Sequence, residues 1–337
     1  MSRRNALLCF AIVIALLSPL TVYGEDKPPL RAGIIGLDTS HVEAFTKTLN
    51  NPEAKGILAR VRVVAAYPGG SPDIPASRDR LNGFTEKLRD TYHVEIVDSI
   101  DALLKKVDVV FLESVDGRPH LEQVKPVFRA KKPVFIDKPV AGSLADAVEI
   151  YRLAKESGTP CFSSSALRFS PSIYDVRDDP KYGKILGCDT YGPCTLEPHH
   201  PDLFWYGIHG VEALFTIMGP GCESVTRVQT KDAELVTGKW KDGRIGTFRG
   251  TRKGPYDYGA MIFGAKANGL SKGFGGYEPM LVEICKFFES GKAPVSAEET
   301  LEIYAFMEAA DESKRQDGKP VTLESVLTRA REKKLKD

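Results

Sequence analysis

Long blocks of one charge are absent from the 337-residue sequence, in which 46 Lys and Arg residues are interspersed with 45 Asp and Glu residues. A formal net charge of +1 and the lack of a basic patch argue against a nucleic-acid-binding protein. The sequence also lacks internal repeats and low-complexity segments, so we expect an ordinary globular protein.

Cysteine is scarce and its spacing is uninformative. After residue 24 the chain contains five cysteines, an odd number, and no C-x-x-C pair. Neither a zinc ribbon nor a disulfide scaffold is therefore indicated. A bridge between Cys188 and Cys194 stays open as an alternative for an oxidising compartment.

A long hydrophobic run occurs at the N-terminus. Ala6 to Leu17 is unbroken and follows Arg3 and Arg4, and small residues near Gly24 suit a cleavage site. The run is shorter than the roughly 20 residues of a membrane span. We interpret residues 1–24 as a signal peptide that partly resembles a twin-arginine signal. We therefore expect an exported, periplasmic protein that has no stable membrane span after cleavage. An uncleaved anchor is the alternative.

The remaining chain, about 310 residues, has the length of two domains. Between residues 30 and 165, apolar runs such as "LRAGIIG" and "VDVVFLES" alternate with helical patterns. This alternation predicts an α/β fold with an N-terminal Rossmann domain, a doubly wound parallel sheet. Residues 166–325 hold short β-prone runs, one helix at 202–219 and two closing helices. They predict a C-terminal α+β domain with an open, mostly antiparallel sheet.

Two glycines are missing from the turn after the first strand. The dinucleotide-binding fingerprint G-x-G-x-x-G would place glycines at 36, 38 and 41, where the sequence has Gly36, Asp38 and His41. A carboxylate beside a pyrophosphate costs Coulomb energy and needs more room than glycine. We expect Asp38 to bond instead to the free amides of a helix that begins with a capping box, Ser40 to Glu43. A nucleotide displaced outward remains compatible with this arrangement.

The acid that usually contacts the ribose is missing after the second strand. The Gly- and Pro-rich loop at 67–77 stands there, and we expect it at the surface. Ser71 with Arg78 or Arg80 would favour the 2′-phosphate of NADP. A remodelled loop without any ribose contact is the alternative.

Longer segments carry a family pattern. They are "DVVFLESVDGRPHLEQV", "AKKPVFIDKPVAGSLADAVEIYRLAKESG", "FWYGIHGVEALFTIMG" and "YEPMLVEICKFFESGKAPVSAEETLEIYAFMEAADESKRQDGKPVTL". Together with "AGIIG" they resemble the glucose–fructose oxidoreductase / inositol dehydrogenase (Gfo/Idh/MocA) family over about residues 31 to 325.

The resemblance implies NAD or NADP as cofactor, a sugar-type substrate, and Lys138 and His209 as catalytic residues. Lys138 matches the lysine of the family's Glu-Lys-Pro segment, with Asp137 in place of Glu. A base near the carbinol withdraws the hydroxyl proton, and a cation stabilises the developing alkoxide. The family's acid four residues before the histidine is replaced by Trp205. Without it, we expect His209 to titrate near its ordinary pKa of about 6.5.

The same reasoning yields two sets of binding residues. For the cofactor they are Gly36, Leu37, Asp38, Ser40, His41, Ser71, Ser114, His120, Asp137 and Lys138. For the substrate they are Arg168, Tyr191, His199, Trp205 and Glu212.

Two functions remain open. The first is an exported NAD(P)-dependent oxidoreductase acting on a sugar or polyol derivative. The second is a non-redox carbohydrate-binding protein, or a sugar lyase or hydrolase, in which Trp205 stacks on the sugar ring. A metal is not expected, because the His and acidic residues between Glu197 and Glu212 match no specific zinc spacing. The second sheet is a candidate surface for homo-oligomerisation.

Overall fold

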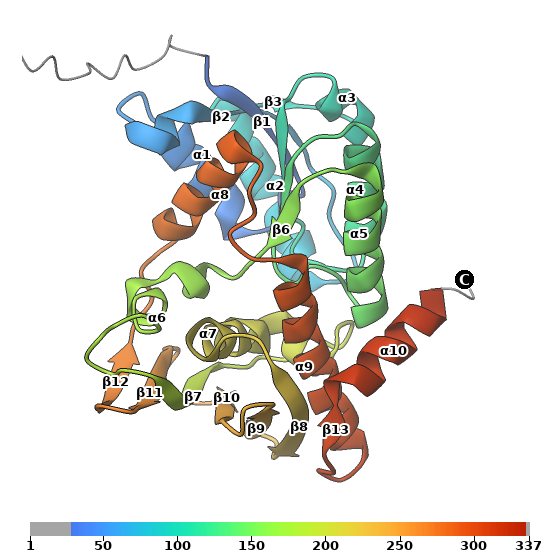
Figure 1. Ribbon diagram of the computed structural model, residues 1–337. Coiled ribbons are helices and arrows are strands. Elements are labelled where there is room, and N and C mark those ends of the chain that lie inside the picture. Colours follow the sequence, from blue (N-terminus) through green and yellow to red (C-terminus); the bar gives the residue numbers. More distant parts are fainter. Residues whose placement is uncertain (1–27, 335–337) are drawn as a thin grey trace, which may run out of the picture.

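A computed structural model describes residues 28–334 of the chain. The signal peptide inferred for residues 1–24 lies outside this range. In Figure 1 the first sheet lies in the upper part of the molecule and the second sheet in the lower part, with α9 running from one to the other. Within this range, every helix is too short or too polar to cross a membrane.

The first sheet is parallel and has six strands in the order β3-β2-β1-β4-β5-β6. Its strands are β1 (Leu30–Ile35), β2 (Val61–Tyr67), β3 (Glu95–Ile96), β4 (Val109–Leu112), β5 (Val134–Ile136) and β6 (Cys161–Ser163). The connecting helices are α1 (Ser40–Leu49), η1 (Gly56–Arg60), α2 (Pro75–Asp90), α3 (Ile100–Leu104), α4 (His120–Arg129) and α5 (Leu144–Ser157). This order and direction confirm the predicted Rossmann topology, in which ligands bind at the carboxyl ends of the strands.

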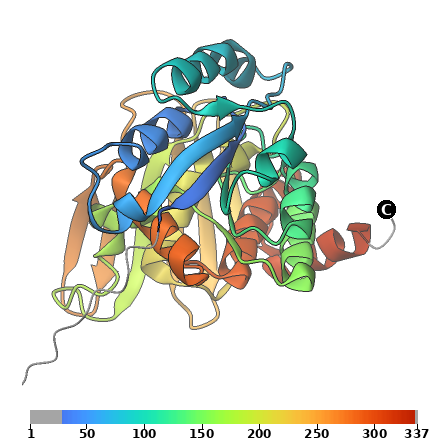
Figure 2. The same cartoon turned by 90° about the horizontal axis from the view of Figure 1, so that it is seen from above.

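Helices cover both faces of this sheet, as the view from above shows (Figure 2). The central strands β4 and β5 are buried along their whole length, which explains their uninterrupted apolar sequences. One face packs on α4 and α5, with Val124 and Ile150 in its core. The other face packs on α1 and on the late helix α8 (Glu278–Ser290), which contribute Phe45 and Phe287. Although α8 falls within the range 166–325 that the sequence assigns to the second domain, it completes the core of the first.

The second sheet has seven strands in the order β12-β11-β7-β10-β9-β8-β13. They are β7 (Ile185–Pro193), β8 (Cys222–Gln229), β9 (Ala233–Trp240), β10 (Ile245–Thr251), β11 (Gly259–Gly264), β12 (Asn268–Lys272) and β13 (Val321–Thr322). All pairs are antiparallel except β7 with β10, so the predicted mostly antiparallel sheet is confirmed.

Helices separate the second sheet from the first domain. They comprise η2 (Ala166–Phe169), α6 (Pro171–Tyr174), the π-helical turn η3 (Leu203–Gly207), α7 (Ile208–Met218), α9 (Ala297–Arg315) and α10 (Leu323–Lys334). The single helix predicted at 202–219 is thus a π-helical turn followed by an α-helix. In Figure 1, α7 lies between the second sheet and the first domain. This position allows residues of η3 and α7 to face the carboxyl edge of the first sheet.

Local expectations differ in outcome. Helix α1 begins at Ser40 after Thr39, and no side chain caps it, so the predicted capping box does not form. The loop at 67–77 reaches the surface through Pro72, Asp73 and Pro75, but Ile74 and Ser77 are completely buried and α2 already begins at Pro75. Cys188 and Cys194 are free buried thiols, so the alternative of a bridge between them is not realised.

Candidate active site

A cavity of about 210 Å³ lies where the two domains meet. From the first domain, its wall includes the start of α1, residues of α2, and Val115 and Lys138, which follow β4 and β5. The second domain contributes mainly rings. The lining residues are Thr39, Ser40, His41, Ala76, Arg80, Val115, Lys138, Ala166, Leu167, Trp205, Tyr206, His209, Tyr258, Phe274 and Tyr277. Polar groups on one side and aromatic rings on the other suit a small polyhydroxy ligand.

Lys138 and His209, the two predicted catalytic residues, both line this cavity. The Lys138 ammonium lies 5.2 Å from the centroid of the Tyr206 ring. Burial lowers the pKa of Lys138, and neighbouring Asp137 partly opposes this effect. Nδ1 of His209 lies 2.7 Å from Oγ of Ser165, a contact that fixes the ring.

His209 does not titrate near its ordinary value. Burial, together with the positive charge of Lys138, lowers the pKa of His209 well below the ordinary range. The sequence-based expectation of about 6.5 is therefore wrong. The imidazole is neutral at physiological pH, which is the form that can accept a proton from a substrate hydroxyl.

Four predicted substrate residues lie outside the lining of this cavity. Arg168 is buried against Glu212 and Glu299, with N···O distances of 2.7 and 2.6 Å. Glu212 also accepts a bond from the Ser165 amide, which leaves it no pairing with His209. Tyr191 lies against Gly259 in the second sheet, and His199 pairs with Glu197. Of the predicted substrate residues, Trp205 lines the cavity, and substrate contact by the other four stays a prediction.

Asp38 is completely buried and bonds across the turn rather than to the start of α1. Its Oδ1 accepts the backbone N–H of Val115 at 2.9 Å, and its Oδ2 accepts the Ser77 hydroxyl at 2.5 Å. The predicted bonding to the helix amides is therefore wrong. Burial raises the pKa of Asp38, and the bonds from Ser77 and Val115 oppose that rise. The carboxylate ties the β1 turn to the segments after β2 and β4.

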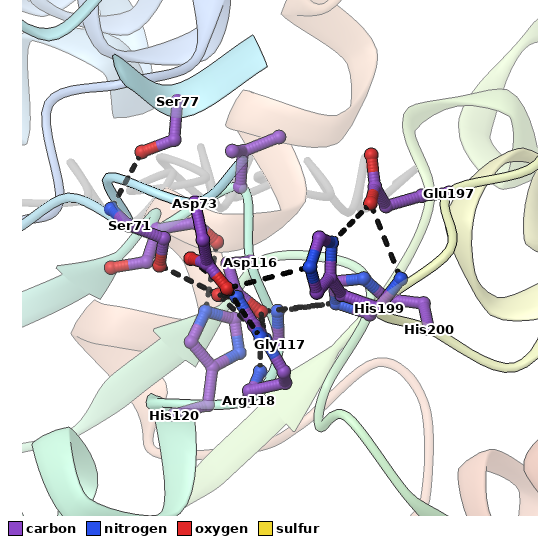
Figure 3. A network of polar contacts seen from close by, with 12 residues as sticks. Ser71, Asp73, Ser77, Asp116, Gly117, Arg118, His120, Glu197, His199 and His200 are labelled. Carbon is purple, nitrogen blue, oxygen red and sulfur yellow. Dashed lines mark hydrogen bonds and ion pairs between the residues drawn. The ribbon is translucent and has the colours of Figure 1, made fainter. Parts of the chain in front are cut away.

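A network of polar contacts extends from Ser77 to the loop before α2 and to the segment after β4 (Figure 3). The Ser71 amide donates to Oγ of Ser77, and the Ser71 hydroxyl donates to Asp116 at 2.6 Å. Arg118 bonds both Asp116 and Asp73, and His200 from the second domain lies 3.1 Å from Asp116. Both polar groups of Ser71 are therefore bonded within the protein, which favours the alternative of a loop without ribose contact. The loop before α2 is fixed at both of its ends.

The other predicted cofactor residues divide between the turn and the strand ends. Gly36 has φ of +89°, and a Cβ there would lie 2.4 Å from the backbone of Ser114, so only glycine fits. Leu37 is completely buried, and its amide donates to Pro68. His120 is also buried, with its ring nitrogens 2.9 and 3.2 Å from the carbonyls of Ser114 and Val140. His120 lies outside the lining of the cavity, and its predicted contact with the cofactor stays a prediction.

The turn after β1 departs from the usual dinucleotide site, whereas the start of α1 still lines the cavity. In a Rossmann domain the pyrophosphate lies against the glycine turn and the helix start. Here Leu37 and Asp38 are buried at that turn, and Asp38 is held by Ser77 and Val115. Thr39, Ser40 and His41 line the cavity of about 210 Å³ at the helix start.

His41, Glu113 and Asp137 form a second polar group beside the cavity. Nδ1 of His41 lies 2.9 Å from Oδ2 of Asp137 and 3.4 Å from Oε2 of Glu113. The sequence reasoning missed Glu113, although an ionisable residue directly after a buried strand is an available signal. It also missed the cavity residues Tyr206, Tyr258 and Tyr277, for which only the folded arrangement is informative. The His and acidic residues between 197 and 212 do not gather into a ligand set within residues 28–334.

The fold and site define a two-domain protein with a Rossmann domain of the oxidoreductase type. Residues 30–164 match the model of the Gfo/Idh/MocA oxidoreductase family, described as having an NAD-binding Rossmann fold. The first domain is thus similar to this family, in agreement with the resemblance of the sequence motifs.

Solved structures share the fold over most of the chain. A probable dehydrogenase from Thermotoga maritima is 20% identical, with a TM-score of 0.72 over 88% of this chain and 100% of the other. Scyllo-inositol dehydrogenase from Lactobacillus casei, crystallised with NAD(H) and scyllo-inositol, is 14% identical, with a TM-score of 0.71 over 88% and 99%. At these identities the likeness establishes the two-domain fold.

A sequence relative is the uncharacterized protein YMR315W of Saccharomyces cerevisiae, 21% identical over 182 residues. The match covers 52% of this chain and 48% of that protein, so it spans about half of the relative's length.

Proposed function

We propose that this protein is an oxidoreductase that acts on a CH–OH group of a sugar or polyol with NAD or NADP. The observation that carries this proposal is the meeting of Lys138 and His209, from different domains, in one cavity lined by aromatic rings. The match of residues 30–164 to an NAD-binding oxidoreductase family supports the reaction class. The scyllo-inositol in the Lactobacillus casei structure supports a polyol as the ligand class.

The chain's own residues supply proton handling and orientation. Neutral His209 accepts the hydroxyl proton of the substrate, and Ser165 holds its ring in place. Lys138 binds the same oxygen and stabilises negative charge on it. Trp205, Tyr206 and Tyr258 offer faces for the apolar side of a sugar ring. When bound, the nicotinamide nucleotide would exchange the hydride with the carbinol carbon.

A non-redox function is the second candidate, and the Asp38 closure favours it. If Asp38 never leaves Ser77 and Val115, the same cavity would bind a carbohydrate without a nucleotide. Lys138 and His209 would then serve a lyase or hydrolase, or would only bind the sugar.

One experiment separates these candidates. The exported protein is purified mildly, denatured with acid, and analysed by mass spectrometry for released nucleotide, and a second sample is titrated with NAD(H) and NADP(H). Bound or bindable nucleotide, together with turnover on a panel of sugars and polyols, supports the oxidoreductase. A protein that arrives empty and fails to bind added nucleotide contradicts it and leaves the non-redox function.

We also propose that the protein is exported, from the character of residues 1–24. Fractionation of the producing cells, followed by N-terminal sequencing, tests this proposal. Protein retained in the cytoplasm with its first 24 residues intact would contradict it.

Homo-oligomerisation through the second sheet is a further part of the proposal. Its support is a set of exposed apolar side chains on that sheet: Leu186, Val228, Leu235, Ile245, Met261, Phe263 and Leu270. Light scattering of the wild type and of an Ile245→Lys, Leu270→Lys variant tests it. A wild type that is monomeric at micromolar concentration would refute this interface.

A further inference from the structure

We propose that His41, Glu113 and Asp137 form a binding site for a divalent transition-metal ion. The three residues come from the first turn of α1 and from the positions directly after β4 and β5. Each offers one ligand atom, and these atoms all lie within 4.8 Å of one another. This site does not depend on the proposed function, because binding of the ion is measured without turnover.

Unpartnered buried oxygens point to a missing ligand. Glu113 is 0% exposed and Asp137 is 1% exposed. Both carboxylate oxygens of Glu113 and Oδ1 of Asp137 lack hydrogen-bond partners among the described residues. An unsatisfied buried carboxylate costs free energy, and buried charges in proteins are usually paired or bound to metal. His41 is the neighbouring basic residue, and its Nδ1 lies 3.4 Å from Oε2 of Glu113, which is long for a hydrogen bond.

The two distances from His41 fit a shared ion. Metal–nitrogen and metal–oxygen bonds of about 2.0–2.2 Å place neighbouring ligand atoms about 2.9–3.5 Å apart for octahedral to tetrahedral angles. Nδ1 of His41 lies 2.9 Å from Asp137 and 3.4 Å from Glu113, inside that interval. A divalent ion with two carboxylates and a neutral imidazole is electrically neutral overall, which suits a buried place.

The donor set indicates the class of metal. One imidazole nitrogen with two carboxylates suits Zn²⁺ or Mn²⁺, whereas Ca²⁺ and Mg²⁺ prefer oxygen ligands alone. His41 lines the cavity, which provides an entry path. An ion bound there would lie at the cavity wall, near Lys138, with its remaining coordination positions available to a ligand hydroxyl.

The test uses the whole exported protein, from which bound metal is removed with EDTA followed by dialysis. Calorimetric titration with ZnCl₂ and with MnCl₂ should show one ion per chain at micromolar affinity or tighter for at least one of them. Glu113→Gln should weaken that affinity at least tenfold. Glu197→Gln is the matched control, because Glu197 also lies 2.7 Å from a histidine nitrogen but at the surface, and it should leave the affinity unchanged.

Absence of binding, or equal affinity in Glu113→Gln, would overturn the proposal and leave the cluster as an ion pair of protonated His41. If Glu113→Gln does not fold, anomalous diffraction from wild-type crystals soaked in ZnCl₂ or MnCl₂ decides. A peak about 2.1 Å from the ligand atoms of all three residues supports the site. A peak elsewhere, or none, refutes it.

Discussion

The carboxylate of Asp38 and the backbone amide of Val115 are joined by a 2.9 Å hydrogen bond between the ends of two neighbouring strands. The bond closes the place where a Rossmann protein holds pyrophosphate. This hydrogen bond needs a backbone N–H at position 115, which a proline there would lack.

Replacing Asp38 by glycine should tighten binding of NAD and NADP, by roughly tenfold or more. The substitution removes a negative charge and returns backbone room to the turn. Fluorescence or calorimetric titration measures the affinity. Asp38→Asn serves as the control, because it keeps the volume and removes only the charge. Unchanged or weaker affinity in Asp38→Gly would show that Asp38 does not oppose the phosphates.

Replacing Lys138 by alanine should reduce turnover at least a hundredfold while the fold stays intact. The Lys138 ammonium faces the cavity and lies over the ring of Tyr206, so its removal should cost little packing. Activity on a sugar panel and thermal melts are compared with Lys125→Ala, a surface control paired with Glu122. Normal activity, or a collapsed melt, in Lys138→Ala would contradict the assigned role.

The pH–rate profile should report the depressed pKa of His209. Because burial and Lys138 favour the neutral ring, the acidic limb should lie below the ordinary imidazole range of about 6.5. Trp205→Asp places a negative charge one helical turn away, which favours imidazolium and should move this limb to higher pH. Under the non-redox function the substitution would instead abolish sugar binding. A variant with normal sugar binding and an unmoved profile would leave Trp205 as a packing residue.

Acid should destabilise the protein in part through Asp116. Burial opposes its ionisation, but bonds from His200, Arg118 and Ser71 outweigh burial and hold the pKa of Asp116 well below its usual range. The unfolded chain then binds more protons, so the stabilisation is complete above about pH 4 and is lost as the pH falls below it. Urea unfolding at pH 7 and pH 3 should show Asp116→Asn destabilised by about 1–3 kcal/mol at pH 7 and by less at pH 3. An equal loss at both values would exclude this linkage.

The sequence predicted the fold well because periodicity is a local property. Buried strands such as β4 and β5 are continuous apolar runs, and helix α5 has Ser143 before it and Gly158 after it, as caps require. Family motifs likewise located Lys138 and His209. The partners of Asp38 could not be found this way, because Ser77 and Val115 lie 39 and 77 residues further along the chain. The partner of Arg168 was missed for the same reason, since Glu299 is 131 residues away.

The packing of α8 onto the first sheet has a consequence for how the chain can be divided. Met280, Ile284 and Phe287 fill the face of the Rossmann domain that α1 leaves open. A fragment ending at residue 165 would therefore expose this apolar surface to water and should aggregate or remain unfolded. Synthesis must therefore reach α8 before the core of the first sheet can be complete.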